Sequence, residues 1–221
     1  KLIKSLVSLL ITGALLYLLN NKVGVAPPLG KFLSPFQGFW ATVEKGDLPS
    51  SETLSILELQ GEVTVLYDEN RVPHVFATND HDLYVAQGYL QARDRLWQMD
   101  FVARSAGGRL AEVIGERAAG IDAYKRRMGS VYGAEQSLAL MEKNPKAKEV
   151  TEAYSAGINA YIHQLSPKDY PLEFKLLDYA PEEWTPKKCA LLIEEMSFTL
   201  ASGTDELRLT NVQKKLGAAA A

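Results

Sequence analysis

The sequence predicts an α+β protein that is mostly helical, with one pair of strands at the start of its main domain. Residues 61–77 contain the alternating apolar pattern of strands, and later stretches carry apolar residues at helical spacing behind good helix-capping residues. Apolar residues make up 47% of the 221-residue chain and charged residues 23%, which is typical of a chain that buries a core. A separate apolar helix is expected in front of this domain.

Residues 1–22 are predicted to form an apolar helix at a membrane. Ser5–Asn21 contains seventeen residues without a charge, and lysines flank it on both sides. Such a helix would be about 25 Å long, slightly shorter than the roughly 30 Å apolar layer of a bilayer. A cleaved secretory signal and a retained signal anchor both have this pattern, but Val23–Ala26, followed by Pro27–Pro28, is a poor cleavage site. A retained transmembrane anchor is therefore preferred, with the body in the periplasm or the extracellular space.

Residues 23–59 are predicted to be a linker, because prolines and turn-forming residues are frequent in them. Pro27–Pro28 stiffens the chain and argues against a helix in this segment. Four aromatic residues of the linker would lie either at the membrane interface or on the core of the domain. They are Phe32, Phe36, Phe39 and Trp40.

The main domain, residues 60–217, is predicted to begin with a hairpin. Gly61–Tyr67 alternates as a strand does, and Val75–Ala77 is the expected returning strand after a turn. Five helices are expected after it: one capped by Asn79 or Asp80 that runs to about Arg104, a short one at Arg109–Ile114, one that begins at Asn144–Pro145, one that begins at Thr185–Pro186, and one at Asp205–Leu216. Residues 218–221 are alanines and form a tail with no assigned function.

Charge and motif content exclude several classes of function. The chain has 24 Lys and Arg against 27 Asp and Glu, so no basic excess indicates a nucleic-acid partner. Cys189 is the one cysteine and cannot form a disulfide within the chain. Nucleotide-binding glycine loops, HExxH and GxSxG are absent. The pairs His81–Asp82, Glu182–Glu183 and Glu194–Glu195 are interpreted as solvated groups, so the residues alone show no complete active site.

Several motifs nevertheless occur in a specific order. Val72–Gly115 contains VPHVFA, DLYVAQGYLQARDRLWQMD and RSAGGRLAEVIG, and AYSAGINAY, PLEF and EWTP follow at residues 153–161, 171–174 and 183–186. Over about residues 60–216 the sequence resembles the α chain of the penicillin amidase (penicillin acylase) family of N-terminal-nucleophile hydrolases. The resemblance implies an αββα sandwich completed by a β chain, both chains arising from one exported precursor that cuts itself.

The resemblance also implies that no catalytic residue lies in this chain. The nucleophile would be a serine at the amino terminus of the β chain, which would also supply the oxyanion donors. A free α-amine has a pKa near 8, so it can accept a proton from its own serine hydroxyl.

By the same resemblance, Met196 and Leu200 would line the acyl pocket, and Glu206 would be one ligand of a structural Ca²⁺ whose other ligands come from the β chain. Met196 and Leu200 are four residues apart and so share a helix face. Without the resemblance, the two apolar residues would be interpreted as core, and Glu206 as an acid that favours the first turn of a helix.

Two departures from the penicillin G acylases concern specificity. Leu200 stands where those enzymes have an aromatic residue, which suggests a pocket shaped for a group other than phenylacetyl. Thr199 stands where they have an arginine, so binding of a β-lactam carboxylate is in doubt. We therefore expect an exported, membrane-anchored hydrolase of a small N-acyl amide, such as an acyl-homoserine lactone, an acyl peptide or a β-lactam side-chain amide. The alternative is a catalytically silent scaffold or interaction subunit of a larger membrane complex.

Two further groups of motif residues receive structural predictions. Residues expected in buried ion pairs and packing contacts at the seam with the β chain are Asp94, Arg95, Trp97, Asp100, Arg109 and Glu112. Glycines expected in turns with positive φ are Gly107, Gly108 and Gly115.

Overall fold

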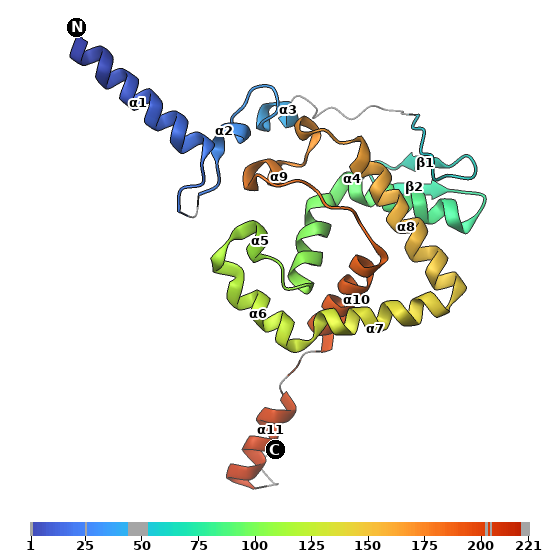
Figure 1. The fold of residues 1–221 in the computed structure, drawn as a ribbon. Helices are drawn as coiled ribbons and strands as arrows, with labels where there is room; N and C mark the ends of the chain where they lie inside the picture. The colour runs from blue at the N-terminus through green and yellow to red at the C-terminus, as the bar shows by residue number, and fades with distance from the viewer. Residues whose placement is uncertain (1, 25, 44–52, 202, 204, 218–221) are drawn as a thin grey trace.

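The computed structural model describes residues 2–24, 26–43, 53–201, 203 and 205–217, so the predicted tail at 218–221 lies outside the described residues. The first helix, α1 (Leu2–Asn20), has no buried residue and projects away from the body (Figure 1). Its 19 residues are long and apolar enough to cross a membrane, as expected from the sequence. A signal sequence passes the same test, so α1 fits both interpretations of this segment.

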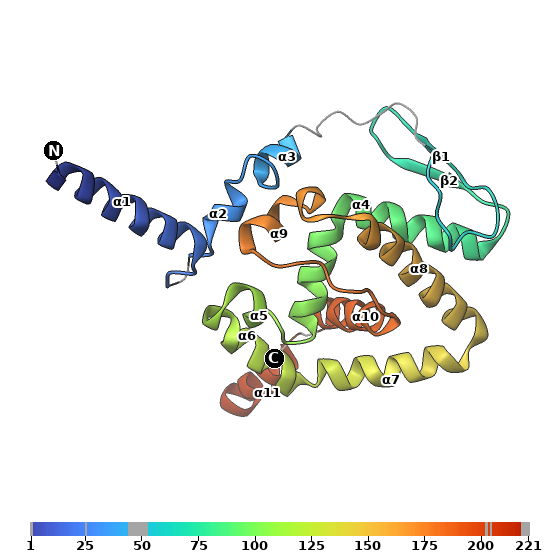
Figure 2. The ribbon, with the colours of Figure 1, turned by 45° about the horizontal axis from the view of Figure 1, so that its top comes forward.

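The linker contains helices that the sequence analysis excluded. α2 (Leu29–Phe32) and α3 (Phe39–Val43) are short, and α2 begins directly after Pro28, because a proline is well tolerated just before or at the start of a helix. Figures 1 and 2 show both helices beside α9 (Leu172–Leu177). The ammonium of Lys175 in α9 donates hydrogen bonds to Gly38 O at 3.0 Å and to Thr42 Oγ1 at 2.8 Å. The described part of the linker is therefore docked on the domain.

The predicted hairpin is present and slightly shorter than expected. β1 (Thr64–Tyr67) and β2 (Pro73–Phe76) are antiparallel, with Thr64 opposite Phe76 and Tyr67 opposite Pro73. The Asp68 carboxylate accepts hydrogen bonds from the backbone N–H groups of Asn70 and Val72, each at 2.9 Å, and so closes the turn.

The core lies where α4 (Asp80–Ala106) crosses α8 (Pro145–Gln164). Both helices begin as predicted, because the Asn79 side chain accepts the N–H of Asp82 and the Asn144 side chain accepts the N–H groups of residues 146 and 147. α4 has a kink at Arg95, whose φ is −142°. The main core consists of Ala92, Leu96, Met99, Ala103, Ile158, Phe174 and Trp184.

Most of the remaining helices surround this crossing (Figure 2), whereas α11 extends away from the body (Figure 1). The remaining elements are α5 (Ala111–Ile114), a 3₁₀ turn (Glu116–Ala118), α6 (Ala119–Met128), α7 (Ser130–Lys143), a 3₁₀ turn (Pro167–Asp169), α10 (Pro186–Ala201) and α11 (Asp205–Leu216). α10 and α11 have the predicted starts, and α5 begins two residues later than expected. α6 and α7 were not predicted. α10 packs on α7 and α4.

Two local predictions need correction. Gly108 and Gly115 have positive φ values of 64° and 78°, as expected, but Gly107 has a φ of −76°. Gly107 still closes α4 with an ordinary helical bond to Ala103 O, and the reversal occurs one residue later.

Asp82, interpreted from the sequence as part of a solvated cap, is fully buried. Its carboxylate accepts the backbone N–H groups of Gln60 and Gly61, both at 2.9 Å. Burial raises the pKa of Asp82, but these bonds and those from His81 and Asn79 lower it to about 2. Asp82 therefore ties the start of α4 to the segment that leads into the hairpin.

We expect Gly157→Ala to lower the free energy of unfolding by about 3 kcal/mol, at the upper end of overpacking effects. A Cβ at Gly157 would overlap the backbone carbonyl of Val85 at the α4–α8 crossing, where neither helix can yield easily. Urea denaturation measures the change. Gly120→Ala is the control, since nothing lies within 4 Å of a Cβ there, and it should gain less than about 1 kcal/mol. Equal stability of the two variants would contradict this account of the crossing.

Candidate functional site

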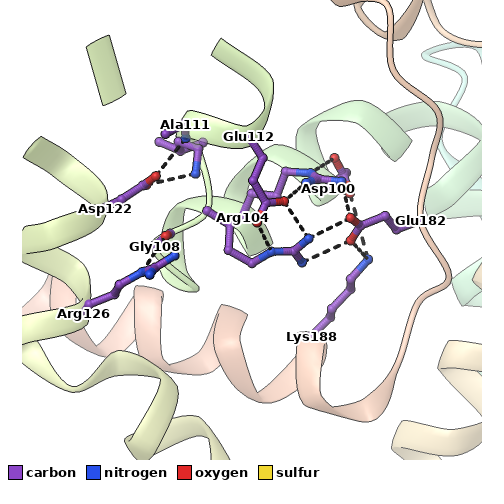
Figure 3. A network of polar contacts seen from close by, with 11 residues as sticks. Asp100, Arg104, Gly108, Ala111, Glu112, Asp122, Arg126, Glu182 and Lys188 are labelled. Atoms are coloured by element: carbon purple, nitrogen blue, oxygen red, sulfur yellow. Dashed lines mark hydrogen bonds and ion pairs between the residues drawn. The ribbon is translucent and has the colours of Figure 1, made fainter. Parts of the chain in front are cut away.

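A buried arginine connects three segments of the chain near one end of α4. The guanidinium of Arg104 contacts Asp100 Oδ2 at 2.8 Å, Glu112 Oε2 at 2.9 Å and Glu182 Oε1 at 2.7 Å. The side chains of Arg104 and Asp100 are only 5% and 3% exposed. Figure 3 shows the carboxylates arranged around this guanidinium. Because they come from α4, α5 and the segment before α10, the arginine fixes these elements relative to one another.

Two more cations complete this Arg104 network. Arg109 bridges Glu112 and Glu182 at 2.7 and 2.8 Å, and Lys188 Nζ lies 3.3 Å from Glu182 Oε2. The network balances three cations with three carboxylates, namely Arg104, Arg109 and Lys188 with Asp100, Glu112 and Glu182. Since its groups are paired with one another, the network supports the fold rather than offering a free acid or base.

The pKa shifts within the network have clear causes. Burial raises the pKa of Glu182, but the hydrogen bond from Arg109 and the charges of Arg104 and Lys188 lower it to about 2. Burial lowers the pKa of Lys188, although Asp100 and Glu182 oppose the change. Glu182 is thus held ionised at neutral pH, as its pairing with the three cations requires.

The turn between α4 and α5 is held by a second set of bonds from α6. Asp122 accepts the backbone N–H groups of Leu110 at 2.9 Å and Ala111 at 2.8 Å, and Arg126 Nε donates to Gly108 O at 3.0 Å (Figure 3). Asp122 and Arg126 were missed in the sequence. Their spacing of four residues places them on one helix face and was the only available signal.

The predicted seam residues have mixed outcomes. Asp100 is buried in an ion pair as expected, and Arg109 pairs with Glu112. Asp94 and Arg95 are exposed in this chain, and their burial at a seam with a β chain stays a prediction. Arg95 donates to Gln98 at 3.1 Å beside the kink. Trp97 stacks on Phe101 with ring centroids 4.9 Å apart.

The interpretation of the paired glutamates as solvated groups is wrong for three of the four residues. Glu182 belongs to the Arg104 network, and Glu195 contacts Lys125 at 2.7 Å. Glu194 accepts a hydrogen bond from Ser137 Oγ at 3.0 Å. Of the four residues, Glu183 alone is mainly exposed, and it contacts His163. Apart from Lys188, which is six residues from Glu182, these partners lie 20 to 78 residues away in the sequence, so helix periodicity does not predict them.

The two predicted pocket residues lie on an open face of α10. Met196 is 60% exposed and Leu200 is 79% exposed, and Ile193 on the same face is 47% exposed. Ile193 was not predicted from the sequence, although the spacing of 193, 196 and 200 is that of one helix face. We call these three residues the α10 apolar face. Within the described chain it faces solvent, so a pocket here needs walls from another polypeptide.

The predicted calcium ligand lies in the first turn of α11. Glu206 is exposed, and its neighbour Asp205 contacts Arg208 at 3.4 Å. Among residues 2–24, 26–43, 53–201, 203 and 205–217, no group of three or more His, Cys, Asp or Glu side chains is arranged to hold a metal ion. Calcium takes six to eight oxygen ligands, so a site at Glu206 would depend on a second chain for most of them.

The fold and these residues define a class of protein. Residues 62–221 match the family model described as penicillin amidase, so the chain belongs to the penicillin amidase family. This confirms the resemblance found in the sequence.

Curated relatives and a solved structure agree with the family. The chain is 34% identical over 154 residues to the penicillin acylase 2 proenzyme of Pseudomonas sp. (strain SE83), an alignment covering 70% of this chain and 19% of the relative. It is 32% identical over 168 residues to the acyl-homoserine lactone acylase QuiP of Pseudomonas aeruginosa, covering 75% of this chain and 20% of the relative. The chain thus spans about one fifth of the curated relatives that it matches.

One structural neighbour is the thermostable penicillin G acylase from Alcaligenes faecalis. The two structures have a TM-score of 0.61 and 27% sequence identity, and the match covers 71% of this chain and 85% of the other. The match therefore includes most of one chain of a solved acylase, and it supports the mostly helical fold with its small sheet.

We expect Asp100→Asn to lower the free energy of unfolding by about 3 kcal/mol, because it breaks a buried ion pair. This value is at the lower end for such pairs, since Arg104 keeps its contacts with Glu112 and Glu182. Chemical denaturation measures this loss. Glu149→Gln is the matched control, since the Lys146–Glu149 pair is 3.5 Å long with both side chains about half exposed, and it should change stability by less than about 1 kcal/mol. If the two variants lose the same stability, the Arg104 network is not the constraint described here.

Proposed function

We propose that this chain is the α-chain portion of an exported N-acyl amide hydrolase. The observation that carries the proposal is the family match over residues 62–221, which covers the whole body including the α10 apolar face. The match to 85% of one chain of a penicillin G acylase supports the assignment to a single processed chain. The word proenzyme in the name of the Pseudomonas relative supports a precursor that is processed.

The nucleophile in this proposal is the amino-terminal serine of a β chain. Its hydroxyl oxygen attacks the carbonyl carbon of the amide while its own α-amine accepts the hydroxyl proton. The carbon–nitrogen bond breaks, the amine product leaves with that proton, and an acyl-enzyme ester remains. Water then hydrolyses the ester to the free acid and restores the serine. The present chain supplies walls and support, which agrees with a described polar network whose groups are paired with one another.

Acyl recognition is assigned to Met196 and Leu200. A methionine adapts to varied apolar shapes, and a leucine leaves more space for an aliphatic chain than an aromatic residue does. Thr199 carries no charge that could hold a substrate carboxylate. We therefore propose an N-acyl amide with an aliphatic acyl group, a class that includes the acyl-homoserine lactones in the name of the second relative.

The helix α1 is proposed to retain the enzyme at the membrane, with the body on the exported side. Its 19 residues are mostly apolar, and the lysines near its amino end favour a cytoplasmic location for that end. The docked α2 and α3 segment would then hold the body close to the bilayer.

The proposed function is tested on protein made from the whole gene. Mass spectrometry should find two chains, the second beginning with serine, and the purified protein should release fatty acid from N-octanoyl-homoserine lactone. Leu200→Phe should lower kcat/KM for this substrate by about tenfold, because the ring fills space for the acyl chain. Leu140→Phe, at an exposed position of α7, is the control and should have no effect. An uncut, inactive protein would favour the silent scaffold instead.

Calcium binding at Glu206 is proposed as part of the same assembly. In the two-chain protein, Glu206→Gln should lower the bound calcium found by metal analysis and the thermal stability that calcium addition restores after chelation, because the site loses one anionic oxygen ligand. Asp205→Asn changes the neighbouring acid in the same helical turn and should retain the metal. Equal calcium content in both variants and the wild type would contradict the assignment.

A further inference from the structure

The C-terminal half of α10 is held by a salt bridge that is separate from the Arg104 network. Lys125 of α6 contacts both carboxylate oxygens of Glu195, at 2.9 and 2.7 Å. The two side chains are 7% and 21% exposed, so the pair is largely shielded from water. The same ammonium lies 4.0 Å from the centroid of the Phe198 ring. One buried cation thus contacts two α10 residues that are three positions apart.

Neighbouring residues support this Lys125–Glu195–Phe198 group. The Tyr124 ring meets the Phe198 ring edge-on, with centroids 6.1 Å apart. On α7, Ser137 Oγ donates to Glu194 Oε1 at 3.0 Å, and a Cβ at Gly133 would lie 2.8 Å from Glu194 Oε2. α10 is therefore contacted by α6 and α7 on one side.

The side held in this way is opposite the α10 apolar face. Successive residues of an α-helix are rotated by roughly 100°, so residues 194, 195 and 198 lie on the side of α10 away from residues 193, 196 and 200. The exposures agree, since Glu194, Glu195 and Phe198 are partly buried while Met196 and Leu200 are exposed. A rotation of α10 about its axis would move both sides together.

The Lys125–Glu195–Phe198 group is also the last point toward the C-terminus at which side chains of α6 hold α10. Toward the C-terminus of α10, the polar and aromatic contacts with other described elements extend no further than Phe198. A buried ammonium is strongly destabilised without its carboxylate, so the Lys125–Glu195 pair has one favourable arrangement. The position of Leu200, two residues beyond Phe198, therefore depends on this pair.

We propose that Lys125 and Glu195 are positioning residues for acyl selectivity. Their salt bridge sets the rotation of α10 and so the depth to which Met196 and Leu200 enter the acyl pocket. The inference rests on the proposed function, because it takes the α10 apolar face as a pocket wall. Neither residue belongs to the α10 apolar face, so we expect both to act on the substrate only through the position of α10.

The experiment uses the two-chain enzyme and two probes, the p-nitroanilides of octanoic and phenylacetic acid. Lys125→Met should change the ratio of the two kcat/KM values by about tenfold, as expected when a pocket wall is misplaced. Lys125→Arg keeps the charge and should restore the wild-type ratio. Lys187→Met is the matched control, because it breaks the exposed Lys187–Glu135 pair between α10 and α7, and it should leave the ratio within about twofold.

A second measurement separates this inference from the proposed function. Hydrogen exchange of the amides at 195–200 should be faster in Lys125→Met than in Lys187→Met. If the wild type hydrolyses neither probe, the proposed function fails, and the exchange rates still decide whether the pair positions α10. Equal losses of kcat/KM for both probes with an unchanged ratio would overturn the inference. Glu195→Gln replaces Lys125→Met if the latter does not fold.

Discussion

The burial of the Arg104 guanidinium is the constraint on which the arrangement of the domain depends. A charged group that is 5% exposed must be matched by nearby carboxylates, and here they come from α4, α5 and the segment before α10. The Tyr179 ring lies 5.3 Å from the guanidinium and covers another side of it. The end of α4 and the start of α10 therefore cannot move apart without exposing or unpairing this charge.

α10 connects the Arg104 network to the exposed surface of the domain. Its first half is fixed through Lys188 in the Arg104 network and through buried Ala190 and Leu191, and its second half presents Met196 and Leu200 to solvent. A continuous helix transmits position along its length better than a loop does. The support of the proposed pocket wall is therefore built within this chain, whereas the reactive group belongs to another chain in our proposal.

The sequence predicted local features well and long-range pairing poorly. Asn79 and Asn144 marked helix starts because side-chain capping is a local interaction, and their hydrogen bonds are present in the structure. The motifs also identified the family. Glu182 was misinterpreted because its cations, Arg104 and Arg109, are more than 70 residues away and only the fold brings them together. The spacing placed Met196 and Leu200 on one helix face, which the structure shows to be exposed, and their role in a pocket stays a prediction.

The two exposed apolar surfaces differ in a way that indicates different coverings. α1 is exposed on every side and mostly apolar, and two of its polar side chains bond to their own helix: Thr12 Oγ1 donates to Ser8 O and Asn20 Nδ2 to Leu16 O, each at 2.9 Å. Such a helix suits lipid, where every polar group must be satisfied internally. α10 is apolar and exposed on one side only, while its other side is held by ion pairs. Because the opposite side of α10 is packed on α6 and α7, its apolar face is suited to contact with a second polypeptide, in agreement with the two-chain acylase that we propose.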